Sequence, residues 1–238
     1  EEISRRKARF FNQGGRHRAI SRKRLRGGWA LLATLGCALP FTVGFMIPAG
    51  TILIHALARA ELWADPALYK AAWNTVVVGS LAAFLTVTGG LLLVYGVRLS
   101  GRTLPRLLQP ITTIGYAAPG AVLAVGILLP LATFDNALAD FVLGLTGFDP
   151  GLILTGSSFA LVLAYFVRFF AIGQGAADAA LERVSPSLSM AARSLGRRQG
   201  QVLKEVYMPL IKGSIGSALL LVFVDCVKEL PATLLLRP

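Results

Sequence analysis

Residues 71–97 read AAWNTVVVGSLAAFLTVTGGLLLVYGV and contain no charged side chain. The hydrocarbon core of a bilayer is about 30 Å thick, so a helix rising about 1.5 Å per residue needs about 20 apolar residues to cross it. This stretch exceeds that length. Its apolar residues run continuously, whereas a strand of a membrane β-barrel alternates apolar and polar residues. Residues 71–97 therefore predict a transmembrane α-helix.

The same pattern recurs along the chain. Three further stretches lack charge, and a fourth is broken only by Lys212; together they are residues 31–54, 107–134, 151–167 and 206–224. The chain is 55% hydrophobic and 15% charged, whereas a soluble domain carries about 25% charged residues. We therefore predict an all-α membrane protein with five transmembrane helices. The alternative is a large soluble protein with buried helices, but the chain has too few charged residues to form a solvent-exposed surface.

The expected spans lie at residues 29–57, 73–97, 107–133, 151–175 and 208–227. Pro40 and Pro48 predict a kink in the first span, because a proline removes a helical hydrogen bond. Residues 1–28 are basic and predict a cytoplasmic linker. Residues 29–238 form the predicted transmembrane domain, with a core at about 71–238.

Charge predicts the orientation of these spans. The net charge is +12, which in a soluble protein would indicate nucleic acid, but here we predict no nucleic-acid partner, since cytoplasmic loops of membrane proteins are enriched in Lys and Arg. Basic residues gather in residues 1–28 and in the second and fourth loops, whereas the third loop has Asp135, Asp140 and Asp149 without a basic residue. The N-terminus is therefore predicted to be cytoplasmic.

The fourth loop contains a predicted surface helix. Ser185 can cap it and Pro186 fits its first position, where the missing N–H would be unpaired anyway. Gly196 fits its end, because glycine adopts the left-handed conformation that terminates helices. One apolar stripe follows from the helical spacing of Leu188, Ala191, Ala192 and Leu195. This small stripe suits a groove on a partner protein; a helix lying flat on the lipid surface is the alternative.

Three segments of this loop resemble a known family. Met190-Ala191-Ala192, then Gly196, then Val206-Tyr207-Met208-Pro209 are similar to the EAA loop of type I ABC-importer permeases, whose pattern is Glu-Ala-Ala, three residues, Gly, nine residues and Ile-x-Leu-Pro. The spacing fits at every position. Met190 replaces the family's Glu, and Val206 and Met208 are conservative replacements. The resemblance covers roughly residues 71–230.

The resemblance implies a permease fold and a function. The coupling loop would comprise Pro186, Leu188, Met190, Ala191, Ala192, Leu195, Gly196 and Pro209. Its helix would dock on a cytoplasmic ABC ATPase dimer, and a periplasmic binding protein would deliver the solute to spans in the inner membrane that alternate between inward-open and outward-open states. The chain itself is predicted not to be an enzyme and to need no cofactor, since it has no phosphate loop of the G-x-x-x-x-G-K-S/T kind.

The end of the chain indicates which solute is transported. Residues 228–238, KELPATLLLRP, resemble the iron(III) branch of these permeases, and the basic opening resembles a linker joining two permease halves. The resemblance implies the second half of a two-half permease, cut before its last span, beside a first half or a second permease subunit. The alternatives are the same machine for thiamine, a polyamine, sulfate or a phosphonate, or a membrane scaffold with no transport pathway.

Two pairs of residues are candidates for the transport pathway. Asp225 and Glu229 are spaced to share one helical face near the outer end of the fifth span, and carboxylates suit a hard metal ion. An ordinary ion pair with Lys228 is the alternative reading. In the third span, Pro119-Gly120 would free a backbone carbonyl, as is tolerated where helices line a cavity, or would only kink the helix.

One further charge lies inside an apolar run. Arg168 in the fourth span either extends to the cytoplasmic surface or lies inside the bundle, and the sequence leaves both placements open.

Overall fold

The structure, a computed structural model, describes residues 25–101 and 103–237 and falls into two compact units, Glu1–Asp65 and Pro66–Pro238. All regular secondary structure of the described residues is helical. Five helices in them are long and apolar enough to cross a membrane: residues 28–58, 66–100, 120–146, 158–182 and 199–228. The prediction of an all-α, multi-pass membrane protein is therefore confirmed. The predicted linker lies outside the described residues up to position 24.

The first unit contains one long interrupted helix. Helix α2 (Gly28–Phe41) continues through a π-helical turn, η1 (Thr42–Met46), into α3 (Ile47–Ala58), and a 3₁₀ turn, η2 (Ala60–Ala64), follows. Pro40 lies in α2 and Pro48 near the start of α3. Because each proline removes a ladder hydrogen bond, the wider turn forms between them. This turn is the interruption that the two prolines predicted.

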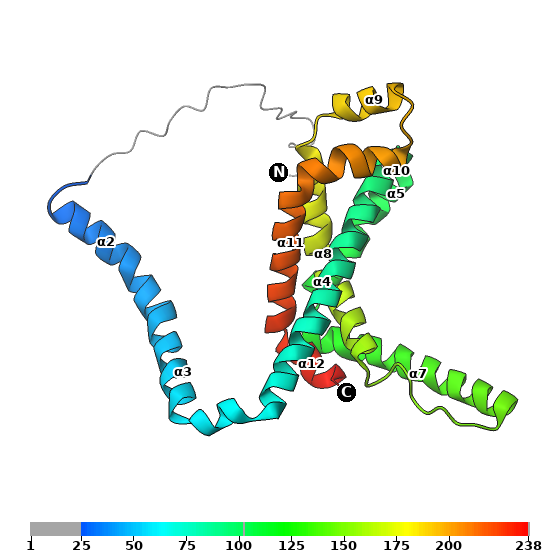
Figure 1. The fold of residues 1–238 in the computed structure, drawn as a ribbon, viewed down its shortest axis with the longest axis horizontal. Helices are drawn as coiled ribbons and strands as arrows, with labels where there is room; N and C mark the ends of the chain where they lie inside the picture. The colour runs from blue at the N-terminus through cyan, green and yellow to red at the C-terminus, as the bar shows by residue number, and fades with distance from the viewer. Residues whose placement is uncertain (1–24, 102, 238) are drawn as a thin grey trace. The chain divides into compact units, whose positions relative to one another are not determined.

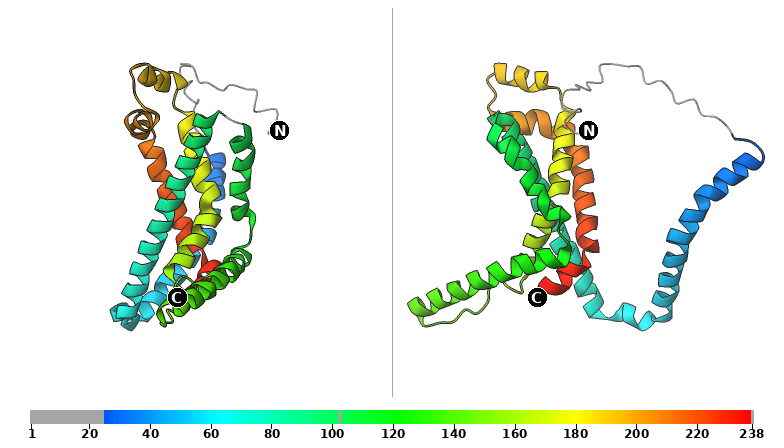
Figure 2. Two further views of the ribbon diagram at one scale, coloured as in Figure 1. Left: turned by 90° about the vertical axis from the view of Figure 1, so that its right-hand side faces the viewer. Right: turned by 180° about the vertical axis from the view of Figure 1, so that it is seen from behind.

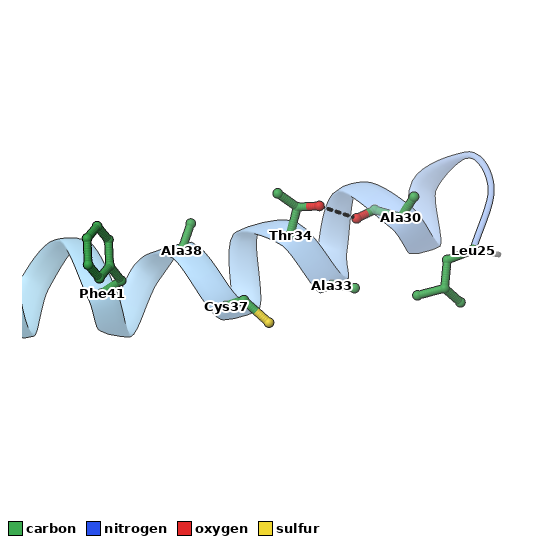
Figure 3. A pocket seen from close by; sticks show the side chains of 7 residues that line it. All are labelled: Leu25, Ala30, Ala33, Thr34, Cys37, Ala38 and Phe41. Atoms are coloured by element: carbon green, nitrogen blue, oxygen red, sulfur yellow. Dashed lines mark hydrogen bonds between the residues drawn. The ribbon is translucent and has the colours of Figure 1, made fainter. Parts of the chain in front are cut away.

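The surface of this helix is suited to lipid. No residue of α2, η1 or α3 is buried. The shallow hollow along α2 in Figure 3 is lined by small and apolar side chains, and its Thr34 hydroxyl donates back to the Ala30 carbonyl (2.9 Å). A surface with so few unpaired polar groups is suited to contact with lipid acyl chains rather than with a polar solute.

The second unit is built on three helices that lie side by side, α4 (Pro66–Ser100), α8 (Ser158–Glu182) and α11 (Met208–Lys228) (Figures 1 and 2). The remaining elements are α5 (Thr103–Leu108), η3 (Gln109–Thr113), α6 (Ile114–Ala117), α7 (Gly120–Thr146), α9 (Pro186–Ser194), α10 (Gln199–Val202), η4 (Leu203–Tyr207) and α12 (Leu230–Leu236). The η3 turn is 3₁₀-helical and η4 is π-helical. The predicted fifth span, 208–227, matches α11.

Helices α4 and α8 touch backbone to backbone. A Cβ added at Gly90 would lie 2.6 Å from the Gln174 backbone nitrogen, and one at Gly173 would lie 2.8 Å from the Thr86 carbonyl oxygen. Small residues at such a crossing let helices approach in lipid, where packing rather than hydrophobicity drives association. The crossing divides the buried residues into two clusters. One lies around Val87, Phe169 and Val222, and the other around Val94, Leu181 and Ile211.

The prediction that the third span, residues 107–133, is a single helix is wrong. Ala118 and Pro119 have extended backbones (ψ 137° and 139°), so α6 stops at Ala117 and a new helix, α7, starts at Gly120. Helix α7 leaves the three-helix bundle sideways (Figures 1 and 2). The break follows from Pro119, because proline disfavours helical conformation in the residue before it.

The acidic third loop is also placed differently from the prediction. Asp135 and Asp140 lie within α7, which continues to Thr146, and Asp149 follows it. Asp135 is buried, and its carboxylate accepts hydrogen bonds from the backbone N–H groups of Leu154 (2.9 Å) and Thr155 (2.6 Å). The acid therefore anchors the returning chain to α7 instead of ending the helix.

The fourth span is shifted toward the C-terminus. It was expected at 151–175, but α8 begins at Ser158 and runs to Glu182. Gly151 and Gly156 have positive φ angles of 64° and 72° and keep the preceding segment non-helical. Ser157 then caps the helix, since its hydroxyl accepts from the Phe159 N–H (3.2 Å).

Candidate functional site

The fourth loop forms the predicted surface helix. Helix α9 starts at Pro186, and its N-cap Ser185 accepts a 3.4 Å hydrogen bond from the Ser187 N–H. At its end, Gly196 has a φ of 81° and donates to the Arg193 carbonyl (3.0 Å). Arg197 donates to the Ala192 carbonyl (3.1 Å). This pair of bonds is the Schellman motif that glycine permits, so the predicted start and end of the helix are confirmed.

Most of the apolar stripe of α9 is exposed. Leu188 is 45% exposed, Leu195 is 82% exposed and Ala191 is exposed, whereas Ala192 is half-buried. Met190, at the position of the family's Glu, is exposed as well. An exposed row of small and apolar side chains on a helix held by its two ends is available to a groove on another protein.

The base of this loop is fixed to the bundle. The Tyr95 hydroxyl, from α4, donates to the Gln199 carbonyl (2.7 Å) at the start of α10, and the Tyr95 ring packs edge-on to Tyr207 (5.7 Å between centroids). Nearby, Arg98 of α4 pairs with Asp178 of α8 (2.7 Å). The ends of α4 and α8 and the start of α11 thus form one support beneath α9. Pro209 lies at the second position of α11 and is exposed.

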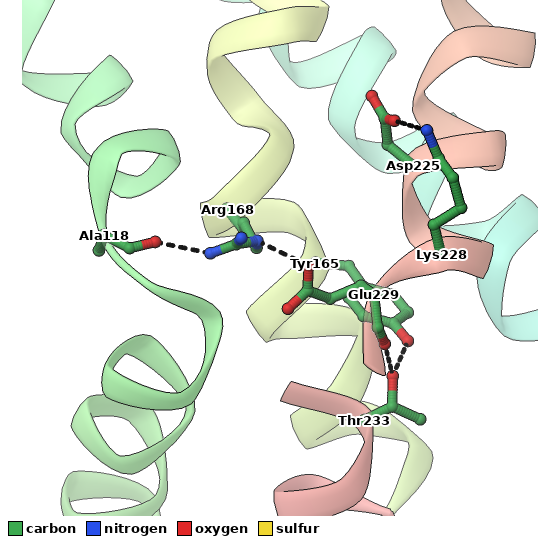
Figure 4. Close-up of polar contacts among 7 residues, drawn as sticks. All are labelled: Ala118, Tyr165, Arg168, Asp225, Lys228, Glu229 and Thr233. Atoms are coloured by element: carbon green, nitrogen blue, oxygen red, sulfur yellow. Dashed lines mark hydrogen bonds and ion pairs between the residues drawn. The ribbon is translucent and has the colours of Figure 1, made fainter. Parts of the chain in front are cut away.

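The candidate pathway residues lie at a second place, around Arg168 (Figure 4). Pro119 is the N-cap of α7, and the carbonyl of Ala118 before it accepts a hydrogen bond from Arg168 Nη1 (2.6 Å). Arg168 Nε lies 3.0 Å from Glu229 Oε2. A Cβ at Gly120 would collide with Glu229 Oε1, so the glycine leaves room for the carboxylate as it is placed.

The prediction that Asp225 and Glu229 share one helical face is wrong. Helix α11 ends at Lys228, and Glu229 has an extended backbone (φ −79°, ψ 93°) between α11 and α12. The two carboxylates consequently point to different partners, as Figure 4 shows: Asp225 pairs with Lys228 (2.8 Å), while Glu229 turns inward to Arg168. The ordinary ion pair weighed as the alternative holds for Asp225 and not for Glu229.

Further hydrogen bonds complete this buried polar group. The Thr233 hydroxyl donates to the Glu229 carbonyl, and the Tyr165 and Thr233 hydroxyls are hydrogen-bonded to each other (2.6 Å). Across residues 25–101 and 103–237, no group of three or more His, Cys, Asp or Glu side chains is arranged to hold a metal ion. Sequence reasoning left Arg168 undecided because its partners are 50 and 61 positions away in the chain. The signal available was a single guanidinium in an apolar run, which is costly in a membrane unless paired.

No protein-family model matches the chain, but curated proteins do. It is 30% identical over 214 residues (88% of the chain) to the putative ferric transport system permease protein FbpB 1 of Haemophilus influenzae, and 27% identical over 163 residues (68%) to the Fe(3+)-transport system permease protein FbpB 2 of the same organism. It is also 29% identical over 166 residues (68%) to the ferric transport system permease protein FbpB of Actinobacillus pleuropneumoniae.

The chain spans only part of these relatives: the matches cover 31%, 29% and 21% of their lengths. The permease names of these relatives agree with the all-α fold and the five apolar helices of the described residues. Over about a third or less of their lengths, the chain is therefore similar to proteins named as iron(III) transport system permeases.

Proposed function

We propose that the chain is a transmembrane subunit of an ATP-driven importer that moves iron(III) across the inner membrane by alternating access. The observation that carries this proposal is α9. It is a capped surface helix whose apolar stripe is exposed and whose supporting loop is joined to α4, α8 and α11. A partner that binds the stripe and changes shape with bound nucleotide would move the ends of three membrane helices together.

The partner of α9 in this proposal is a cytoplasmic ABC ATPase dimer, which hydrolyses the ATP. A periplasmic binding protein delivers the solute on the opposite side, and a first permease half or a second subunit completes the pathway. The N-terminus and α9 then both lie in the cytoplasm. Support for this orientation comes from the loop around α9, which carries Arg183, Arg193, Arg197, Arg198 and Lys204.

Iron(III) is the proposed solute because three relatives carry that ion in their names. In the proposal, Pro119, Gly120 and Glu229 border the pathway. Glu229 and Gly120 are in contact at two helix breaks, and discontinuous helices are where transporters place their substrate routes. The solutes weighed as alternatives, thiamine, polyamines, sulfate and phosphonates, become competitors in the experiment.

The test reconstitutes the full-length protein with its ATPase and binding protein in liposomes and measures uptake of labelled iron(III). Ala191→Asp places a charge in the centre of the α9 stripe. Because burying an unpaired carboxylate in an apolar groove is costly, we expect ATPase binding and uptake to fall by about tenfold or more, with membrane insertion unchanged. The matched control is Arg193→Ala, on the opposite face of α9, which should retain both.

Equal ATPase binding by wild-type and Ala191→Asp protein would contradict the assignment of α9. Uptake that an excess of thiamine, a polyamine, sulfate or a phosphonate abolishes, while iron(III) is not accumulated, would retain the importer and replace the solute. ATPase binding without any uptake that depends on ATP would favour the scaffold.

A further inference from the structure

Two breaks in the membrane helices meet at one side chain. The first break separates α6 from α7 at Ala118 and Pro119, and the second separates α11 from α12 at Glu229. Arg168, from the middle of α8, donates through Nη1 to the Ala118 carbonyl and places Nε 3.0 Å from Glu229 Oε2 (Figure 4). A single guanidinium thus bridges three separate elements, which its fork of donors allows.

The bridge is buried and incompletely satisfied. The side chains of Arg168 and Glu229 are only 19% and 9% exposed. Among the described residues, Arg168 Nε and Glu229 Oε1 have no hydrogen-bond partner, although the two groups attract each other as ions. A buried pair with polar atoms left over is a poor source of stability compared with apolar packing. Such unsatisfied groups in a native structure call for an explanation other than stability.

Helix α8 connects this bridge to the loop that carries α9. It runs without a break from Ser158 to Glu182. At its far end, Leu181 and Val184 are buried with Val94 of α4 and Ile211 of α11 in the cluster beneath α9. A displacement of that end of α8 therefore carries Arg168 with it.

We propose that Arg168 is a positioning residue for transport, which transmits the movement of α8 to both helix breaks so that α7 and α12 shift with it. The inference rests on the proposed function. Because the guanidinium contacts both breaks at once, a movement of α8 that keeps these contacts displaces both breaks together. An apolar contact at the same place would not fix the orientation of the two breaks, because dispersion forces, unlike hydrogen bonds, have no preferred direction.

The first test measures the interaction between Arg168 and Glu229 and does not require transport. Arg168→Gln, Glu229→Gln and the double variant of the full-length protein are unfolded with denaturant in detergent, and the unfolding equilibrium constants form a double-mutant cycle. We expect the coupling between the two positions to exceed tenfold in the unfolding equilibrium constant. Either single substitution already breaks the ion pair, so the second substitution has a smaller effect than it has alone. The matched cycle is Arg98→Gln with Asp178→Asn, at a half-exposed pair, where we expect less than about fivefold.

The second test measures the role in transport. Arg168→Lys keeps the charge, but one ammonium group cannot reproduce the guanidinium fork toward both the Ala118 carbonyl and Glu229. We expect iron(III) uptake per ATP hydrolysed to fall at least tenfold, while ATPase binding stays at the wild-type level. A merely structural defect would lower both.

The outcomes separate the two proposals. Coupling below threefold between positions 168 and 229, or wild-type uptake per ATP in Arg168→Lys, overturns the positioning role. If wild-type protein neither binds the ATPase nor takes up a solute, the proposed function fails, and the role of Arg168 in transport fails with it. The cycle still decides whether positions 168 and 229 are coupled, so the two failures are told apart.

Discussion

Gly120 shows how one missing side chain determines the geometry at the centre of the second unit. It is the first residue of α7, and a Cβ there would collide with Glu229 Oε1. Glu229 has little freedom to retreat, because its other oxygen lies 3.0 Å from Arg168 Nε. Sequence reasoning selected Gly120 and Glu229 separately as candidate pathway residues, and the structure brings the two into contact.

Gly120→Ala is therefore expected to lower the free energy of unfolding by about 1–3 kcal/mol, the usual cost of overpacking a filled site. Gly126→Ala is the matched control in the same helix, since a Cβ there has no neighbour within 4 Å, and it should change the free energy by less than about 1 kcal/mol. Denaturant unfolding in detergent gives both values. Equal effects of the two variants would mean that Glu229 does not lie against Gly120 in the membrane protein.

Interactions between residues a few positions apart could be predicted from the sequence, whereas interactions between residues far apart in the chain could not. Ser185, Pro186 and Gly196 act on their immediate neighbours, so the start and end of α9 followed from local chemistry. Arg168 acts on Ala118 and Glu229, which only the packed fold brings within reach. A sequence without its fold gives no information on which of many backbone carbonyls such a group will bind.

At the scale of elements, hydropathy found the spans but misplaced the boundaries of the third and the fourth. The predicted third span runs through Pro119 and ends at residue 133, before Asp135, because an apolar run records the absence of charge and not the direction of the backbone. The structure breaks the run at Ala118 and carries α7 past Asp135. The carboxylate is tolerated there because the N–H groups of Leu154 and Thr155 satisfy it.

The crossing of α4 and α8 is the element contact most sensitive to size. A Cβ at Gly90 would meet backbone atoms of α8, which cannot turn aside as a side chain can. We expect Gly90→Ala to force the helices apart and to lower the free energy of unfolding by about 1–3 kcal/mol. Gly96→Ala, also in α4 but with nothing within 4 Å, is the control. Thermal unfolding in detergent compares them, and indistinguishable transitions would contradict the backbone contact.

At the scale of the whole molecule, the proposed function is mechanical. In that proposal, an ATPase moves helix α9, and the support formed by α4, α8 and α11 passes the movement to the membrane. The fold class and the form of α9 followed from composition and spacing. The tertiary links below it, such as Tyr95 to Gln199, did not, since they join residues that no periodicity relates.

Cross-linking of α9 to the ATPase is the most direct measurement of this claim. A photoreactive amino acid replaces Ala191 on the exposed stripe or Arg193 on the opposite face, in the full-length protein expressed with its ATPase in membranes. We expect illumination to yield an adduct of the ATPase subunit from position 191 and little from position 193, as identified by mass spectrometry. Adducts of equal yield from both positions, or adducts from position 191 only to lipid or periplasmic protein, would contradict it.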